Sequence, residues 1–337
     1  MHLIRCWLLT LSLLTGQALF ASTLFEDDTP IEIELIGPVQ AVIEQRKQPK
    51  PLPFTLRADG QDYAITARAR GKSRLRVCKF PPIRIDFREE AAAGDLFAGL
   101  GKLKLVTQCR DQQSGDMNAL EEYMAYRIFS LLSEAAYRVR LLRISYTDPG
   151  HGVDEDLRHR WGFAIEPTAQ LAARVGGADV DVSGVALKQL DPDQAALVYV
   201  FQYLIGNTDW SLVTSDGDEW CCHNGKLIQI ENKIYYVPYD FDLAGLVDAS
   251  YAKPDPSFRL RSVRKRKYRG FCTDSETLAS AIRRVTSRKA EMYQLFREIP
   301  GMTDKARKKA ETYLTQFFEK AENEKKLLHS FEQQCID

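Results

Sequence analysis

The chain has 337 residues, of which 27% are charged and 45% hydrophobic. Its 46 Lys and Arg residues balance 46 Asp and Glu residues, so the net charge favours neither a nucleic acid nor an anionic membrane as a partner. The length allows one large domain or two closely packed lobes. Beyond the N-terminus no stretch is long and apolar enough to cross a bilayer, so we expect no integral membrane segment.

The first 21 residues have the layout of a secretory signal peptide. Arg5 supplies a positive charge, residues 7–14 form an apolar run, and small residues follow up to Ala21. The run is shorter than the ~20 residues that a membrane-spanning helix requires. We therefore expect cleavage after Ala21, a mature chain that begins at Ser22, and export to the periplasm or the extracellular space. A buried first helix or strand is the alternative interpretation.

Alternation of apolar and polar residues predicts strands in the N-terminal part of the chain. Residues 31–35 and 82–87 have period two, and residues 102–106 follow the same pattern. Gly60 and Gly71 mark turns between these segments. The expected structure is a mostly antiparallel sheet.

Helical periodicity begins further along the chain. Residues 117–134 place apolar side chains on one stripe. A second helix begins at Asp191-Pro192, a cap residue followed by proline in the first turn, and ends at Gly206. This second helix is apolar nearly all round, which predicts that it is buried. The other predicted elements are strands at 138–146 and 161–165, a hairpin of 227–230 with 234–237, and two C-terminal helical segments separated by Pro300-Gly301.

Polar residues suited to chemistry gather around this hairpin. Asp209 follows the buried helix and Asn224 precedes the hairpin. Asp240 and Asp242 come directly after it. Carboxylate and amide oxygens suit Mg or Mn, whose coordination a phosphate-bearing ligand would complete. A free carboxylate beside such a metal can accept a proton from an attacking hydroxyl. The alternative is that these residues cap backbone groups in turns.

The pattern resembles the atypical protein-kinase fold of the HipA toxins and, more closely, that of the CotH kinases. In those families a Gly-Asn-x-Asp loop precedes an asparagine, a hairpin and an aromatic-Asp pair. By position, the resemblance assigns Asp209 as the catalytic base. It assigns Asn224 and Asp240 as ligands of Mg or Mn, and Asp242 as an auxiliary ligand. It also implies ATP as the nucleotide.

The resemblance extends more weakly to the N-terminal part. Residues 68–73 with 82–87 resemble the Arg-Gly-Asn-Ser and Lys-x-x-Tyr-x-Ile-x-Phe stretch of CotH-like proteins. Residues 162–166 resemble the strand that leads into their hinge.

From this alignment the resemblance implies an ion pair between the predicted helix and a strand, formed by Glu121 or Glu122 with Lys104 or Lys102. Arg84 stands at the strand position that usually holds the phosphate-binding lysine. The nucleotide-binding residues that the resemblance implies are Lys104, Arg84, Glu122 and Glu166.

The predicted fold is therefore α+β, a two-lobed protein-kinase-like arrangement with a β-rich N-lobe at 22–167 and a mainly helical C-lobe at 168–337. The predicted function is that of an exported, divalent-metal-dependent, ATP-using phosphotransferase. Because the chain contains no Gly-x-Gly-x-x-Gly loop, a non-catalytic pseudokinase that serves as a binding or scaffold protein of the cell envelope is one alternative. A metal-dependent hydrolase that uses the same carboxylates is another.

A basic run extends from Arg259 to Arg269 and contains seven Lys and Arg residues. Such a run suits an anionic or protein substrate at the cell envelope, such as a phosphorylated protein or an acidic polymer. A solvated surface loop is the alternative. The run is too short and too poor in aromatic residues to indicate nucleic-acid binding.

Six cysteines follow the expected signal peptide, an even number that predicts disulfides in an oxidising compartment. Buried free thiols are the alternative. We expect a bridge between Cys78 and Cys109, which follow neighbouring strands, and a bridge between Cys222 and Cys272, which flank the polar cluster. Cys221 and Cys335 are left unassigned.

Overall fold

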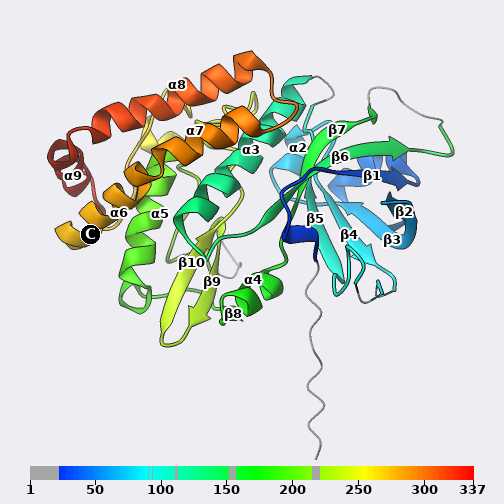
Figure 1. Cartoon of the computed structure of the whole chain (residues 1–337), viewed down its shortest axis with the longest axis horizontal. Helices are drawn as coiled ribbons and strands as arrows, with labels where there is room; N and C mark the ends of the chain where they lie inside the picture. The colour runs from blue at the N-terminus through cyan, green and yellow to red at the C-terminus, as the bar shows by residue number, and fades with distance from the viewer. Residues whose placement is uncertain (1–22, 90, 93, 111–112, 152–156, 215–220) are drawn as a thin grey trace, which may run out of the picture.

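The computed structural model describes residues 23–337 except 90, 93, 111–112, 152–156 and 215–220. The expected signal peptide at 1–21 lies outside the described residues. A β-rich part and a helical part lie side by side (Figure 1). In the ranges that the structure describes, no helix has both the length and the apolar character that crossing a bilayer requires. The expected α+β class is confirmed, whereas a kinase-like two-lobed arrangement with a boundary near Pro167 stays a prediction.

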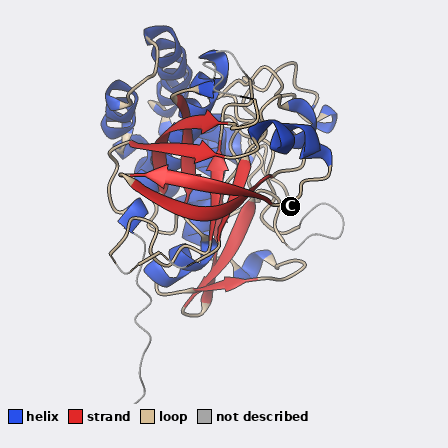
Figure 2. Cartoon of the chain, turned by 90° about the vertical axis from the view of Figure 1, so that its right-hand side faces the viewer, coloured by secondary structure: helices blue, strands red, loops and turns tan. Residues whose placement is uncertain are grey.

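The β-rich part is a closed seven-stranded barrel, whose strands face the viewer in Figure 2. All neighbouring strands are antiparallel except the pair that closes the barrel, which is parallel and places Ile33 opposite Ile144. The expected sheet therefore closes on itself. The strands in barrel order are β1 (Ile31–Ile36), β2 (Leu52–Ala58), β3 (Gln61–Ala69), β4 (Ile83–Phe87), β5 (Lys102–Val106), β7 (Arg160–Ile165) and β6 (Val139–Thr147).

The alternation of apolar and polar side chains decides which face of each barrel strand is buried. On β3, Ile65, Ala67 and Ala69 are buried in the barrel interior, whereas Thr66 and Arg68 point to the outer face and are partly exposed. A separate apolar core lies outside the barrel, between the helices and the outer faces of β5, β6 and β7.

The helical part contains most of the long helices. These are α3 (Gln113–Leu132), α5 (Pro192–Ile205), α6 (Ser275–Ser287), α7 (Lys289–Glu298), α8 (Asp304–Ala321) and α9 (Glu324–Glu332). Three short helices, α1 (Val39–Glu44), α2 (Arg74–Val77) and α4 (Thr168–Arg174), lie in connections. A small antiparallel sheet has the order β10-β9-β8, formed by β10 (Lys233–Pro238), β9 (Gly225–Ile230) and β8 (Ala178–Val180).

Local residues fix both ends of the buried helix α5, as expected. The side chain of Asp191 accepts a hydrogen bond of 2.8 Å from the main-chain nitrogen of Gln194, and Pro192 occupies the first turn. Gly206 ends the helix in the left-handed conformation, with φ of 67°. A side chain at Gly206 would also collide with the hydroxyl of Tyr313. These two ends set where the next segment, which carries Asp209, begins.

Three disulfides form among the described residues. The expected bridge Cys78–Cys109 is confirmed. The expected bridge Cys222–Cys272 is wrong, because the other two bridges are Cys221–Cys222 and Cys272–Cys335. The C-terminal segment lies beside the end of the basic run, where the nitrogen of Cys272 donates to the carbonyl of Ile336 at 2.9 Å. This pairing brings Cys335 to Cys272.

Candidate functional site

The hairpin of β9 and β10 brings Asn224 and Asp240 to neighbouring positions. Gly225 pairs with Pro238 as the last residues of the ladder, and the nitrogen of Tyr239 donates to the carbonyl of Asn224 at 3.0 Å. Asn224 and Asp240 have φ of 52° and 62°, in the left-handed region that asparagine and aspartate enter more readily than most residues. Both side chains therefore leave the open end of the same hairpin.

Asp209 is tied directly to this end of the hairpin. Its carboxylate accepts a hydrogen bond of 2.8 Å from the amide nitrogen of Asn224 and contacts Nε2 of His223 at 2.9 Å. The same amide nitrogen donates to the main-chain oxygen of Asp209 at 2.7 Å. The Asp209 side chain is nevertheless 39% exposed, so a ligand can reach it. The structure thus brings Asp209 and Asn224 together, and His223 joins them although the sequence did not mark it as a site residue.

Arg269 holds the main chain on both sides of Asp209. Its Nη1 donates to the carbonyls of Thr208 and Trp210, the latter at 2.6 Å. The guanidinium also lies over two aromatic rings, 5.3 Å from the centroid of Trp210 and 4.5 Å from that of Phe258. One member of the basic run is therefore a positioning residue for the Asp209 loop.

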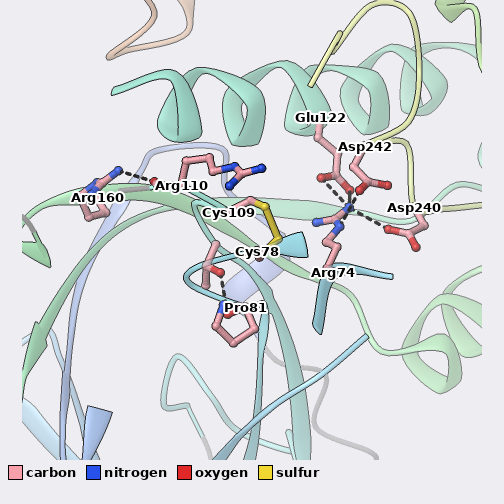
Figure 3. Close-up of a disulfide and its surroundings, with 10 residues drawn as sticks. Arg74, Cys78, Pro81, Cys109, Arg110, Glu122, Arg160, Asp240 and Asp242 are labelled. Carbon is pink, nitrogen blue, oxygen red and sulfur yellow. Dashed lines mark hydrogen bonds and ion pairs between the residues drawn. A yellow bond between two sulfur atoms is a disulfide. The ribbon is translucent and has the colours of Figure 1, made fainter. Parts of the chain in front are cut away.

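A buried arginine joins the candidate metal ligands to helix α3 (Figure 3). Nη2 of Arg74 lies 2.8 Å from Oε1 of Glu122 and 2.8 Å from Oδ1 of Asp240. Its Nε lies 2.8 Å from Oδ2 of Asp242. The Arg74 side chain is only 7% exposed, whereas that of Asp240 is 43% exposed. Asp240 is therefore the member of this cluster that solvent and ligands can reach.

Burial and charge both shift the pKa values of the groups in this cluster. Burial lowers the pKa of Arg74, but the charges of Asp242, Glu122 and Asp240 outweigh burial and raise it well above its usual range. Burial raises the pKa of Glu122 to about 8 and also raises that of Asp242, although the charge of Arg74 opposes both shifts. Burial therefore leaves the carboxyl groups of Glu122 and Asp242 with a high affinity for protons even though Arg74 pairs with both.

The expected ion pair of helix α3 has a different cation. Glu122 pairs with Arg74 rather than with Lys104 or Lys102, and Glu121 receives a hydrogen bond from Asn118. Arg74 lies on α2, one residue after the 68–73 stretch, and the disulfide that begins at Cys78 ties the end of this short helix to the residues after β5 (Figure 3). A single helical turn leaves no periodic signal in the sequence, so the arginine was missed.

Three basic residues lie side by side on the outer face of the barrel. Arg84 pairs with Arg68 on one side and with Lys104 on the other. Like charges directly opposite one another destabilise a sheet, so this ladder favours a bound anion. Asp86 offsets part of the charge, with an oxygen 2.8 Å from Nη2 of Arg84.

The ladder faces the hairpin. The ammonium of Lys104 lies 5.7 Å from the ring centroid of Tyr239, the residue before Asp240. Loss of solvation, together with the charges of Arg70 and Lys226, lowers the pKa of Lys104 to about 8, although the charge of Asp240 opposes the shift. The cations expected to contact phosphate and the carboxylate expected to hold a metal therefore lie close enough to influence each other electrostatically.

Glu166 lies at the link between β7 and α4. Its carboxylate lies 3.0 Å from Nε and 2.9 Å from Nη2 of Arg174, and it accepts a hydrogen bond from the nitrogen of Arg138 at 3.0 Å. The expected contact of Glu166 with a nucleotide stays a prediction. Because its carboxylate oxygens are already engaged and buried, its side chain suits a structural role at this link.

The donor atoms fit a metal that is shared with a phosphate group. The Asn224 amide oxygen and Oδ2 of Asp240 have no hydrogen-bond partner among the described residues, and both are hard oxygen donors. Asp242 is buried and bonded to Arg74, so its place suits orienting Arg74 better than binding an ion. Across the described ranges, no group of three or more His, Cys, Asp or Glu side chains could hold a metal ion. A metal at Asn224 and Asp240 therefore needs oxygens from its ligand or from water.

A cavity of about 240 Å³ opens beside Asp209. Its walls come from the Asp209 loop, from His223, from residues just before the basic run and from Arg269 at the end of that run. The lining residues are Thr208, Asp209, Trp210, Ser211, Thr214, His223, Leu243, Lys253, Asp255, Phe258 and Arg269.

Burial of Glu121 on α3 is expected to make the stability of the protein depend on pH. It is 1% exposed, and burial raises the pKa of its carboxyl to about 8, opposed by the charge of Lys309 and the hydrogen bond from Asn118. Because the folded protein then binds a proton that the unfolded chain releases near pH 4.5, stability falls as pH rises from about 5 to 8. Glu121→Gln is expected to make this slope shallower by about 1 kcal/mol per pH unit in urea unfolding experiments.

The matched control is Glu319→Gln, which changes an exposed glutamate on α8. It is expected to leave the pH slope unchanged. If stability depended on pH equally in the wild type and in Glu121→Gln between pH 5.5 and 8, Glu121 would not carry a proton in the folded protein and the prediction would be wrong.

Comparison with known proteins gives a likeness to solved structures and none to a known family. No model of a known family matches the chain, and no curated protein matches it. Among solved structures, the crystal structure of the Helicobacter pylori proinflammatory kinase CtkA is similar over 84% of this chain and 92% of that one, with 11% identity and a TM-score of 0.39. At that level the likeness identifies neither a family nor an activity for this chain.

Proposed function

We propose that this chain is an exported phosphotransferase that uses ATP with Mg or Mn. The observation that carries the proposal is the joint placement of Asp209, Asn224 and Asp240. An accessible carboxylate is held at the open end of a hairpin whose two ends supply oxygen donors. The basic ladder on the barrel faces the same end and supplies the charge that phosphates need.

Each residue has a defined task in the proposal. Asn224 and Asp240 hold the metal, which neutralises charge on the nucleotide phosphates when it is bound. Lys104 and Arg84 contact the phosphates. Asp209 accepts the proton of the acceptor hydroxyl, and its contacts with His223 and Asn224 keep the carboxylate oriented for that transfer.

Arg74 has two consequences for this assignment. It fixes one oxygen of Asp240 and leaves the other for a metal. It also neutralises part of the charge that would attract the metal, which is the specific observation in favour of a pseudokinase that binds nucleotide weakly or not at all. Three disulfides support export, because disulfides persist in oxidising compartments.

Nucleotide binding in the presence of metal tests the proposal. Wild-type protein is expected to gain thermal stability with ATP plus Mg or Mn, and Asp240→Asn is expected to lose the metal-dependent part of that gain, because the metal loses a charged ligand. Asp62→Asn, which alters an exposed aspartate on the barrel, is the matched control and is expected to behave as the wild type. A wild-type protein that ATP and metal do not stabilise would contradict nucleotide use altogether.

A further inference from the structure

The cavity beside Asp209 is suited in size to a single side chain. Its volume of about 240 Å³ is below the range of roughly 300–1,000 Å³ typical of pockets for drug-sized ligands. Two aromatic rings, Trp210 and Phe258, stand in its walls together with the hydroxyl residues Thr208, Ser211 and Thr214. Because Asp209 is in the wall and its side chain is partly exposed, a group that enters the cavity can reach its carboxylate.

The basic run divides into anchored and free cations. Arg266 is anchored, because its guanidinium donates to the carbonyls of Leu204 at 3.0 Å and Tyr313 at 2.6 Å. Arg269 is anchored by the carbonyls on either side of Asp209. Arg264 lies 3.4 Å from Asp248. These three arginines hold the segment in place.

The other cations of the run have no ion pair among the described residues. They are Arg259, Arg261, Lys265 and Lys267. Lys253 adds an exposed ammonium in the cavity wall itself. Lys267 lies 5.9 Å from the ring centroid of Phe258, so the free cations begin at the edge of the cavity.

Among the described residues, the carboxylates that line the cavity match its own cations in number but do not offset the free cations of the basic run. Besides Asp209, the lining contains Asp255, whose carboxylate accepts a hydrogen bond of 2.7 Å from the nitrogen of Ser257. Hydrogen bonds from Ser257 keep the pKa of Asp255 below its usual range, with a smaller contribution from the charge of Arg269. The described lining is therefore balanced, with Lys253 and Arg269 against Asp209 and Asp255, and the excess positive charge comes from the free cations of the adjoining run.

We propose that this cavity and the free cations beside it form the acceptor site for an acidic peptide segment with a serine or threonine hydroxyl. The inference rests on the proposed phosphotransferase function for the chemistry, but not for binding. The hydroxyl oxygen forms a bond to the γ-phosphorus of ATP as the bond from that phosphorus to the β–γ bridging oxygen breaks. ADP leaves, and the hydroxyl proton passes to Asp209. Acidic residues that flank the hydroxyl contact Lys253, Arg259 and Lys265.

Peptide binding without nucleotide tests the surface. The probes are a fluorescent peptide of about 15 residues with one serine among glutamates, the same peptide with lysines in place of the glutamates, and vesicles containing anionic lipid. The glutamate peptide is expected to bind the wild type, with an affinity that falls as salt rises, and the lysine peptide is not. A triple variant is expected to weaken binding of the glutamate peptide at least about tenfold. It combines Lys253→Glu, Arg259→Glu and Lys265→Glu.

The matched control reverses three exposed lysines on the C-terminal helices, as Lys305→Glu with Lys308→Glu and Lys325→Glu. It has the same change in net charge and is expected to retain binding. Equal losses in the two triple variants, equal binding of the two peptides, or binding of vesicles but not of peptide would overturn the proposal.

A second measurement separates this inference from the proposed function. Phosphate transfer from ATP is expected to the serine peptide and not to a copy with alanine in its place. If the acidic peptide binds at this surface but ATP neither binds nor reacts, the phosphotransferase proposal fails and the acidic-peptide site stands. If ATP reacts but only with peptides that lack acidic residues, the acceptor site is wrong and the phosphotransferase proposal stands.

Discussion

Asp209→Asn is expected to lower phosphate transfer about 100- to 10,000-fold, the usual range for loss of a general base, while metal-dependent nucleotide binding persists. The reason is that Asp209 accepts the proton but holds neither metal nor phosphate in the proposed site. Its two oxygens face the amide of Asn224 and the ring of His223, so asparagine fits the same space with one acceptor fewer. Single-turnover transfer and nucleotide binding, measured on the same preparation, check the two halves of this result.

Asp62→Asn again serves as the control for removing one surface carboxylate. If Asp209→Asn lost both nucleotide binding and phosphate transfer, Asp209 would be a metal ligand. If phosphate transfer were unchanged, Asp209 would take no part in the reaction. Nucleotide binding by the wild type without any transfer to an acceptor would favour the pseudokinase.

Arg74→Ala is expected to destabilise the protein by about 3–5 kcal/mol, the scale for removing one partner of a buried ion pair. It leaves Glu122 and Asp242 without their cation in a buried setting. Because the raised pKa of Glu122, about 8, makes protonation easy, the loss is expected to be smaller at pH 5.5 than at pH 8.5. Urea unfolding at the two pH values measures both the size and the sign of the effect.

Arg57→Ala is the contrasting surface variant. Arg57 also contacts two carboxylates, Glu34 and Asp62, but its side chain is 48% exposed. We expect Arg57→Ala to change the free energy of unfolding far less than Arg74→Ala does, because solvent already screens the contacts of Arg57. A similarly small change for Arg74→Ala at pH 8.5 would show that the buried cluster is not charged in the way proposed.

Elements set by neighbouring residues were predictable from the sequence. The period of two located β5 at Lys102–Val106, and the Asp191-Pro192 and Gly206 signals located both ends of α5. The polar residues around the hairpin could be grouped because β9 and β10 are joined by a short turn, which forces Asn224 and Asp240 to the same end.

Features that depend on distant segments could not be predicted in the same way. Arg74 meets Glu122 and Asp242 across 48 and 168 positions of the chain. The partner of Cys272 is 63 positions away, and closure of the barrel pairs β1 with β6. Nothing in the local sequence selects one arginine or cysteine over another for such contacts, because the choice depends on how the whole chain packs.

The alternation of anchored and free cations along the basic run also has an evolutionary consequence. Arg269 holds the Asp209 loop and Arg266 joins α5 to α8, both through main-chain carbonyls, so a change at either disturbs the fold whichever acceptor is used. Arg259 and Lys265 contact no carboxylate among the described residues, so a change at either leaves the packed interior untouched. In the proposed acceptor site, preference can therefore diverge between descendants of this chain by exchange of a few exposed side chains, while the packed frame that carries them is retained.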